Sequence, residues 1–247
     1  MFRNSTLKEL VDEDAVRGYV LYNFGIKFYE CEEATLGDVC QQLGLKVEQV
    51  ENEIISAKQF QEGELPLKSY PVDLIIEYLK HSHLIFIKYK LPYIGKLVES
   101  FQAAKTEYST IAKDLKILFP LFAEDFIEHI YHEEDTLFTY IHQLEKSVHN
   151  RYNYGELYYQ MENNSLQLFA TQHEAHDDEM AGIRKITKEY CLAADSPLHV
   201  KVIYAELMQF EKSLQTHATI ENEILFPKAM MLENKVRRML AESSKYN

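Results

Sequence analysis

Two segments of the sequence repeat one arrangement of side chains that can bind metal ions. His129 is followed four residues later by Glu133, His217 is followed at the same spacing by Glu221, and a Leu-Phe pair comes four residues after each glutamate. Side chains four residues apart on an α-helix project from the same face, about one turn apart. A histidine and a glutamate at this spacing can therefore reach one common centre.

Both pairs interrupt stripes of apolar residues that recur at helical spacing. The first stripe comprises Phe122, Phe126, Leu137 and Tyr140, and the second comprises Ile203, Leu207, Phe210, Leu214 and Ile224. A third stripe contains two more histidines at a similar depth: Leu166, Phe169, His173, His176, Met180 and Ile183. Because burying a carboxylate without a partner costs several kcal/mol or more, the two glutamates require a positively charged partner.

A bound metal would be that partner, because it neutralises carboxylates and accepts imidazole nitrogens as ligands. An isolated His-x-x-x-Glu pair is usually an exposed side-chain pair on a helix, but a repeated pair on an apolar face indicates a metal site. The donors are too many for one tetrahedral ion. They suit two ions bridged by carboxylates, and mixed imidazole and carboxylate ligation is compatible with iron. Four further histidines are expected on the surface: His132, His142, His149 and His199.

The composition argues against several other classes of protein. A net charge of −13 disfavours binding to nucleic acid and docking on an anionic membrane surface. The sequence has no glycine-rich phosphate loop, no apolar stretch of about 18 residues and no apolar segment typical of a signal peptide. The three cysteines form no Cys-x-x-Cys pair, which fits reduced thiols and a cytoplasmic location.

Helical periodicity dominates the chain, so we predict an all-α fold with a small N-terminal helical domain over residues 1–62. Within it, one short helix is expected to have an N-cap at Thr35 and to end at Gly44. A second helix is expected to stop near Gly25. A linker that contains glycine and two prolines follows this domain.

A second domain is predicted over residues 72–243. It is expected to contain four long helices and a shorter tail, at residues 72–106, 109–149, 156–192 and 197–226, then on to about 243. Pro92 and Pro120 are expected to kink or break the first two helices. Four helices of this length with short connections imply an up-down four-helix bundle.

The sequence resembles the hemerythrin-like di-iron proteins of the repair-of-iron-centres (ScdA/YtfE-like) type over nearly its whole length. Its segments "HIYHEEDTLF" and "HATIENEILFPKAM" look like the two His-x-x-x-Glu motifs of that family. "HDDEMAGIRKIT" looks like the histidine motif of the third helix, and "HLIFIKYKLPYI" like that of the first. The stretch "YNFGIKFYECEEATLGDVCQQLGL" is similar to the small helical domain that precedes the hemerythrin-like bundle.

The resemblance implies a non-haem di-iron centre with two iron ions. Its terminal ligands would be His129, His176 and His217, and its bridging carboxylates would be Glu133 and Glu221. The first helix must supply one more histidine, and the family's ligand there aligns with Leu84, which cannot bind iron. His83 lies one residue away and His81 about one turn away, and we favour His83. His173 is a weaker substitute.

The function implied by the resemblance is the repair of iron–sulfur clusters damaged by oxidative or nitrosative stress, by donation of iron. The partners would be damaged iron–sulfur proteins, with no nucleic acid and no membrane, and the sequence is compatible with a homodimer. We expect an iron donor rather than a turnover enzyme. The alternatives are an O2- or NO-binding or sensing hemerythrin-like protein, and a di-iron reductase of NO or peroxide.

The cysteines depart from the family pattern. Family members often carry two adjacent cysteines followed by glycines, whereas the corresponding stretch "FYECEEATL" has Cys31 alone. Cys31 and Cys40 could act as thiols or as transient iron ligands, although Cys40 is equally well read as a small buried apolar residue. Cys191 belongs to no motif and is read as structural.

Overall fold

The fold is seen in a computed structural model, which describes residues 2–57, 67–102, 108–148 and 178–243, and the single residues 159, 161, 166 and 169. In this part of the chain the secondary structure is helical, and the β contact is one isolated bridge between Thr6 and Thr35. The prediction of an all-α fold is confirmed. The hemerythrin-like four-helix bundle stays a prediction.

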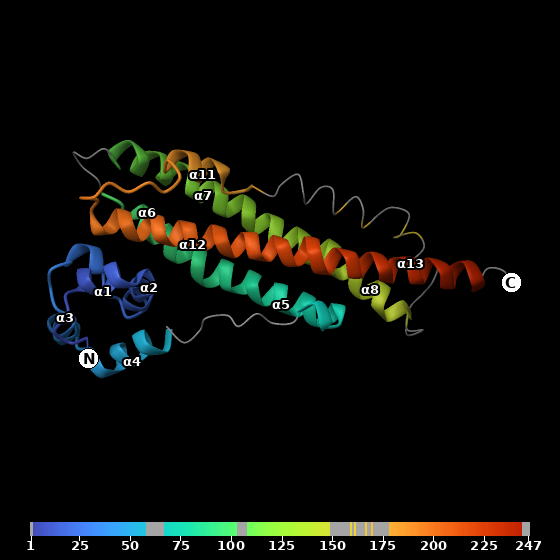
Figure 1. Cartoon of the computed structure of the whole chain (residues 1–247), viewed down its shortest axis with the longest axis horizontal. Helices are drawn as coiled ribbons and strands as arrows, with labels where there is room; N and C mark the ends of the chain where they lie inside the picture. The colour runs from blue at the N-terminus through green and yellow to red at the C-terminus, as the bar shows by residue number, and fades with distance from the viewer. Residues whose placement is uncertain are drawn as a thin grey trace. The chain divides into compact units, whose positions relative to one another are not determined.

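The N-terminal part of the chain forms four short α-helices and one turn of 3-10 helix. Their bounds are α1 (Leu7–Glu13), α2 (Ala15–Asn23), η1 (Phe28–Glu30), α3 (Leu36–Leu43) and α4 (Val47–Ala57). Within this group α2 packs against both α1 and α4, and α3 packs against α4 (Figure 1).

Local capping signals explain where these helices begin and end. The Thr6 hydroxyl accepts a hydrogen bond from the backbone N–H of Glu9, and the Glu9 carboxylate accepts one from the backbone N–H of Thr6, which forms a complete capping box at α1. Thr35 caps α3 in the same way through the N–H of Asp38. Gly44 ends α3 with a left-handed φ of 67°, as glycine at this position often does. The predicted cap and stop of this helix are confirmed.

The remainder of the described chain forms longer helices. Their bounds are η2 (Leu67–Ser69), α5 (Val72–Ile85), α6 (Leu91–Glu99), α7 (Tyr108–Glu133), α8 (Thr139–Val148), α11 (Ala181–Ile186), α12 (Leu198–Ile220) and α13 (Phe226–Ser243). None of the described helices is both long and apolar enough to cross a membrane.

Three π-helical segments join these helices end to end. They are η3 (Phe86–Lys90) between α5 and α6, η4 (Glu134–Phe138) between α7 and α8, and η5 (Glu221–Leu225) between α12 and α13. A π segment adds one residue to a helical turn without ending the helix. Helical structure therefore continues from α12 through η5 into α13, and the predicted end of a helix near residue 226 is wrong.

Two prolines lie directly after π segments. Pro92 and Pro227 are each the second residue of an α-helical segment, α6 and α13 respectively. Pro120 lies inside α7, which continues to Glu133. None of these prolines ends its helix.

The predicted helix over residues 156–192 falls largely outside the described residues. Its last part is described, and there α11 ends at Ile186 rather than near 192. Lys188, Glu189 and Tyr190 follow with left-handed φ values of 53°, 58° and 55°. The Tyr190 hydroxyl donates a hydrogen bond of 2.6 Å to the buried Glu211 carboxylate, so a tertiary contact holds the segment in this conformation.

The chain divides into two compact units, each made from several stretches of sequence. The first unit contains residues 1–65, 90–120 and 182–211, and the second contains residues 66–89, 121–181 and 212–247. The core of the second unit is formed by apolar side chains that include Ile75, Leu79, Phe138, Ile141, Leu225 and Ala229. The division at residues 1–62 and 72–243 stays a prediction.

Candidate metal centre

Four side chains of the second unit converge on one point. They are His83 from α5, Glu133 from the last turn of α7, His217 from the last turn of α12, and Glu221 at the start of η5. One nitrogen or oxygen atom of each lies within 4.8 Å of the corresponding atoms of the others. We call these residues the histidine–glutamate cluster.

Both histidines direct the same ring nitrogen into the cluster. The Nε2 atoms of His83 and His217 are 3.0 Å apart. His217 Nε2 lies 3.0 Å from Glu221 Oε1, and His83 Nε2 lies 3.5 Å from Glu133 Oε2. Two imidazole nitrogens and two carboxylates therefore surround one small volume.

Apolar side chains close the cluster off from water. Phe138 stacks on His83 with ring centroids 5.7 Å apart, and Phe86 meets His217 edge to face at 5.7 Å. His83 is 2% exposed and Glu221 is 1% exposed. Electrostatic interactions are strong in such a poorly hydrated environment, and uncompensated charges are costly.

The pKa values of Glu133 and His83 are both shifted so that the neutral form is favoured. Burial, and next the negative charge of Glu221, raise the pKa of the Glu133 carboxyl well above its usual range. Burial, and next the charge of His217, lower the pKa of His83 from 6.5 to about 4. Without a cation the site therefore favours a protonated acid and a neutral imidazole. A metal ion would compensate both carboxylates at once and use the imidazole lone pairs.

Two buried polar atoms of the cluster support the same reading. Glu133 Oε1 and His217 Nδ1 are inaccessible to water and have no hydrogen-bond partner among the described residues. Buried polar atoms are rarely left in this state. The donor set fits a metal ion, since His83, Glu133, His217 and Glu221 could each supply one ligand atom.

Each ligand-bearing helix has a π segment beside the cluster. The segment η4 begins directly after Glu133, η5 begins with Glu221, and η3 begins three residues after His83. Such segments occur frequently at functional sites, because the extra residue changes the direction in which nearby side chains project. The π segments are not evident from the sequence pattern. The signal available was the repeated Leu-Phe pair that ends η4 and spans the end of η5.

The structure brings together four of the eight candidate metal ligands considered from the sequence: His83, Glu133, His217 and Glu221. His81 is exposed on α5 and lies outside the cluster. His129 is partly buried on α7, one turn before Glu133, and is not one of the four. His176 and the substitute His173 lie outside the described residues.

Glu134 is a further residue of the site that the sequence pattern did not predict. Its Oε1 lies 2.8 Å from His83 Nδ1, the ring nitrogen that faces away from the cluster. The sequence signal was available, because Glu134 directly follows Glu133. Its partner, however, lies 51 residues earlier in the chain, so only the fold shows the contact.

The expectation that His199 is a surface residue is wrong. The residue is 8% exposed, and the centroid of its ring lies 4.4 Å from that of Tyr29 and 5.6 Å from that of Phe101. Its Nε2 lies 3.1 Å from the carbonyl oxygen of Leu97. His132 is exposed as expected, and His142 is partly buried. His149 lies outside the described residues.

The three cysteines have free thiols and belong to the first unit. Cys40 is buried, Cys31 is partly buried and Cys191 is exposed. Burial, followed by the charge of Glu30, raises the pKa of Cys31, and burial is also the main cause that raises the pKa of Cys40. A raised pKa keeps a thiol protonated, and the protonated form is a poor nucleophile and a poor metal ligand. These conditions favour the reading of Cys40 as a small buried apolar residue.

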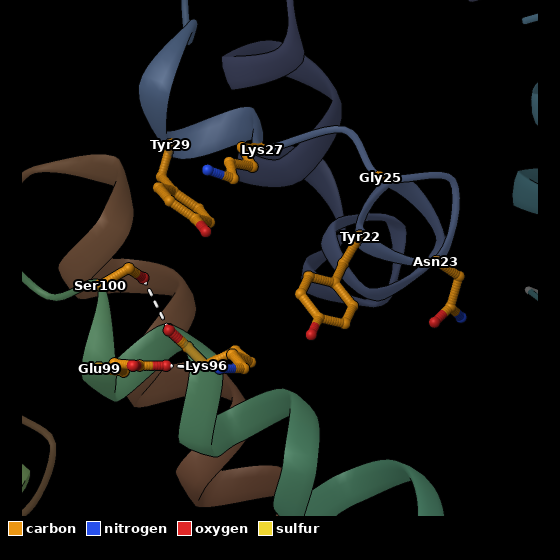
Figure 2. Close-up of a pocket in the computed structure, with 8 residues that line it drawn as sticks. All are labelled: Tyr22, Asn23, Gly25, Lys27, Tyr29, Lys96, Glu99 and Ser100. Atoms are coloured by element: carbon orange, nitrogen blue, oxygen red, sulfur yellow. Dashed lines mark hydrogen bonds and ion pairs between the residues drawn. The ribbon is translucent and has the colours of Figure 1, made fainter. Parts of the chain in front are cut away.

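The first unit contains a separate pocket of about 740 Å³ lined by two tyrosines and two lysines (Figure 2). Lys96 pairs with Glu99 at 2.7 Å, and Lys27 pairs with Glu30 at 3.2 Å. Each positive charge is thus matched by a carboxylate of its own helical turn.

Compared with known proteins, the chain matches no protein-family model and no curated protein sequence.

Proposed function

We propose that this chain is a di-iron protein of the hemerythrin-like repair-of-iron-centres type, which helps to restore damaged iron–sulfur clusters by donating iron. One observation carries the proposal: two imidazoles and two carboxylates, from helices far apart in the sequence, place donor atoms within 4.8 Å of one another. An apolar interior does not hold such a group without a cation except at a large cost.

The donor types argue against two common kinds of metal site, structural zinc and an iron–sulfur cluster. Imidazole nitrogen is a ligand for iron, zinc and copper, whereas carboxylate oxygen suits harder ions. The cluster contains no cysteine, although thiolates are the usual ligands of structural zinc and of iron–sulfur clusters. A mixed nitrogen and oxygen site is therefore suited to non-haem iron.

Two further histidines would complete a site for a second ion. His129 precedes Glu133 by four residues on α7, a spacing that places both side chains on one helix face. His176 is the ligand that the family resemblance implies in the third helix. With them, the donor set becomes four imidazoles and two carboxylates, for which Glu133 and Glu221 would bridge the two ions.

The chemistry of the cluster also suggests how iron would be released. The iron held here would be cargo, and its ligands must be deprotonated to bind it. Burial and the neighbouring Glu221 raise the pKa of Glu133, so protons compete strongly with metal for this carboxylate. Iron would be released more readily from such ligands than from a closed thiolate site.

The test is a transfer experiment under anaerobic conditions. Iron-loaded protein is mixed with a dehydratase whose [4Fe–4S] cluster has lost iron after exposure to nitric oxide, and recovery of dehydratase activity is followed with a chelator present. We expect recovery with the loaded wild-type protein. The Glu133→Ala/Glu221→Ala variant and an equal amount of free ferrous iron under the same chelator should give none.

Recovery that is equal for loaded protein, variant and free iron would refute iron donation. A lasting spectral change on addition of NO or O2, without transfer, would favour the binding or sensing alternative. Turnover of NO or peroxide with an electron donor would favour the reductase.

A further inference from the structure

We propose that Glu134 is a positioning residue of the metal centre, which orients His83 so that its Nε2 lone pair faces the bound ion. The proposal rests on the proposed metal site and adds a residue outside the ligand set. Its basis is the 2.8 Å contact between Glu134 Oε1 and His83 Nδ1.

Two consecutive glutamates approach opposite edges of one imidazole ring. Glu133 Oε2 lies 3.5 Å from His83 Nε2, and Glu134 Oε1 lies 2.8 Å from His83 Nδ1. A carboxylate can only accept a hydrogen bond, so His83 Nδ1 must carry the proton and donate it to Glu134. A neutral imidazole carries only one ring proton. With that proton on Nδ1, the Nε2 atom of His83 keeps its lone pair, which faces Glu133 and His217.

Burial makes this contact effective. His83 is 2% exposed, so no water competes for Nδ1, whereas the side chain of Glu134 retains 28% exposure. The carboxylate is thus partly exposed to solvent on one side while its other side holds the ring. Phe138 stacks on the face of the same ring with an interplanar angle of 4°. Together the hydrogen bond and the stacking restrain both the rotation and the tautomer of His83.

The two histidines of the cluster differ in this respect. His217 Nδ1 has no hydrogen-bond partner among the described residues. The second motif carries Asn222 where the first carries Glu134. Of the two motifs, only the first therefore carries a carboxylate at this position. Carboxylates in this place raise the basicity of a ligand histidine, and their removal typically weakens metal binding about 10- to 100-fold.

The experiment compares Glu134→Ala and Glu134→Gln with the wild type, and uses Asp135→Asn as the matched control. Asp135 is the adjacent, exposed acid of the same segment η4, so its replacement removes an equal charge without touching His83. Circular dichroism and thermal unfolding of each variant confirm that it folds. Two quantities are then measured: the tautomer of His83 in the metal-free protein, by long-range 15N–1H NMR, and the dissociation constant for ferrous iron.

We expect the wild type and Asp135→Asn to hold His83 with its proton on Nδ1 and to bind iron equally well. Glu134→Ala should show a mixture of tautomers and bind iron about 10- to 100-fold more weakly. Glu134→Gln keeps an oxygen acceptor but not the charge, so it should retain the tautomer and lose less affinity.

An unchanged tautomer and unchanged affinity in Glu134→Ala would overturn the proposal. So would an equal loss of affinity in Asp135→Asn, because the effect would then be one of general charge. If the wild type binds no metal, the proposed function fails, and the tautomer measurement on the metal-free protein separately decides whether Glu134 orients His83.

Discussion

The carboxyl group of Glu133 is almost inaccessible to water, with 5% of the residue exposed. Burial, and next the charge of Glu221, raise its pKa. The metal-free protein therefore loses stability as the pH rises above the ordinary value of 4.5, because the unfolded state then releases a proton that the folded state retains. A residue retained at such a cost is expected to contribute to binding rather than to stability.

Glu133→Gln should therefore stabilise the metal-free protein while it weakens metal binding. In the presence of a chelator near pH 7.5, we expect the free energy of unfolding by urea to rise by about 1–3 kcal/mol. The gain should shrink as the pH approaches the usual carboxyl range, because a protonated Glu133 resembles the amide. Glu128→Gln, an exposed position on the same helix, serves as the control. A Glu133→Gln protein that is less stable without metal would contradict this prediction.

His199 gives the protein a stability that depends on pH. Burial lowers the pKa of His199 from 6.5 to about 4, because the folded environment holds it neutral between Tyr29 and Phe101. Its contribution is fully present above the unfolded value of 6.5 and is lost as the pH falls toward about 4, because the unfolded state then binds the proton.

We expect this group to lower the free energy of unfolding by about 2 kcal/mol between about pH 7.5 and about pH 5. His199→Gln removes the titration and keeps an amide that can donate to the Leu97 carbonyl oxygen. The variant should lose less stability than the wild type over the same range, as measured by chemical unfolding at each pH. Equal slopes for both proteins would show that His199 does not titrate as described. His132→Gln, at an exposed position, serves as the control.

At the scale of secondary structure, the helix caps should control stability without affecting the metal centre. Thr35 caps α3 through the backbone N–H of Asp38. Thr35→Ala should lower the free energy of unfolding by about 1 kcal/mol and leave the metal content unchanged. Thr35→Ser, which keeps the hydroxyl, should restore most of the loss. A change in metal content in Thr35→Ala would show that the two properties are not separable.

The helical elements that could be predicted from the sequence are those with local causes. The hydroxyl of Thr35 and the left-handed Gly44 act within a few residues of α3, so spacing rules identify them. The end of α11 could not be predicted in this way. Lys188, Glu189 and Tyr190 adopt left-handed conformations without a glycine, and the contact that holds Tyr190 comes from Glu211 on another helix.

The π segments could not be predicted for a different reason. Apolar residues on one face of an α-helix recur every three or four residues, and this spacing tolerates one extra residue. The apolar stripes around η4 and η5 therefore look continuous in the sequence. The same limitation affects the choice of ligand in the first helix. His81 and His83 both lie on apolar stripes, but in the fold His81 is exposed and His83 is buried.

At the scale of the whole molecule, the cluster exists only in the folded chain. Its members come from α5, α7, α12 and η5, and an unfolded chain cannot hold them within a few ångströms. Spacing in the sequence identifies a pair such as His217 and Glu221. It does not show that His83 lies beside that pair in the fold. Metal binding and folding are therefore expected to be coupled.

Ferrous iron should raise the melting temperature of the whole protein under anaerobic conditions. A ligand that binds only the folded state at 100 times its dissociation constant stabilises that state by about 2.7 kcal/mol. The shift should be absent in Glu133→Ala/Glu221→Ala and complete in Asp135→Asn, as measured by calorimetry. Equal shifts in all three proteins would indicate that iron binds elsewhere, for example to surface acids of this chain, whose net charge is −13.

The central claim is tested most directly by the metal content and visible spectrum of the anaerobically purified protein, measured beside the Glu133→Ala/Glu221→Ala variant. A di-iron centre predicts about two irons per chain, with an iron charge-transfer absorption that the variant lacks. Little iron in the wild type, or the same iron in the variant, would contradict the account and leave the paired histidine and glutamate motifs with a purely structural role.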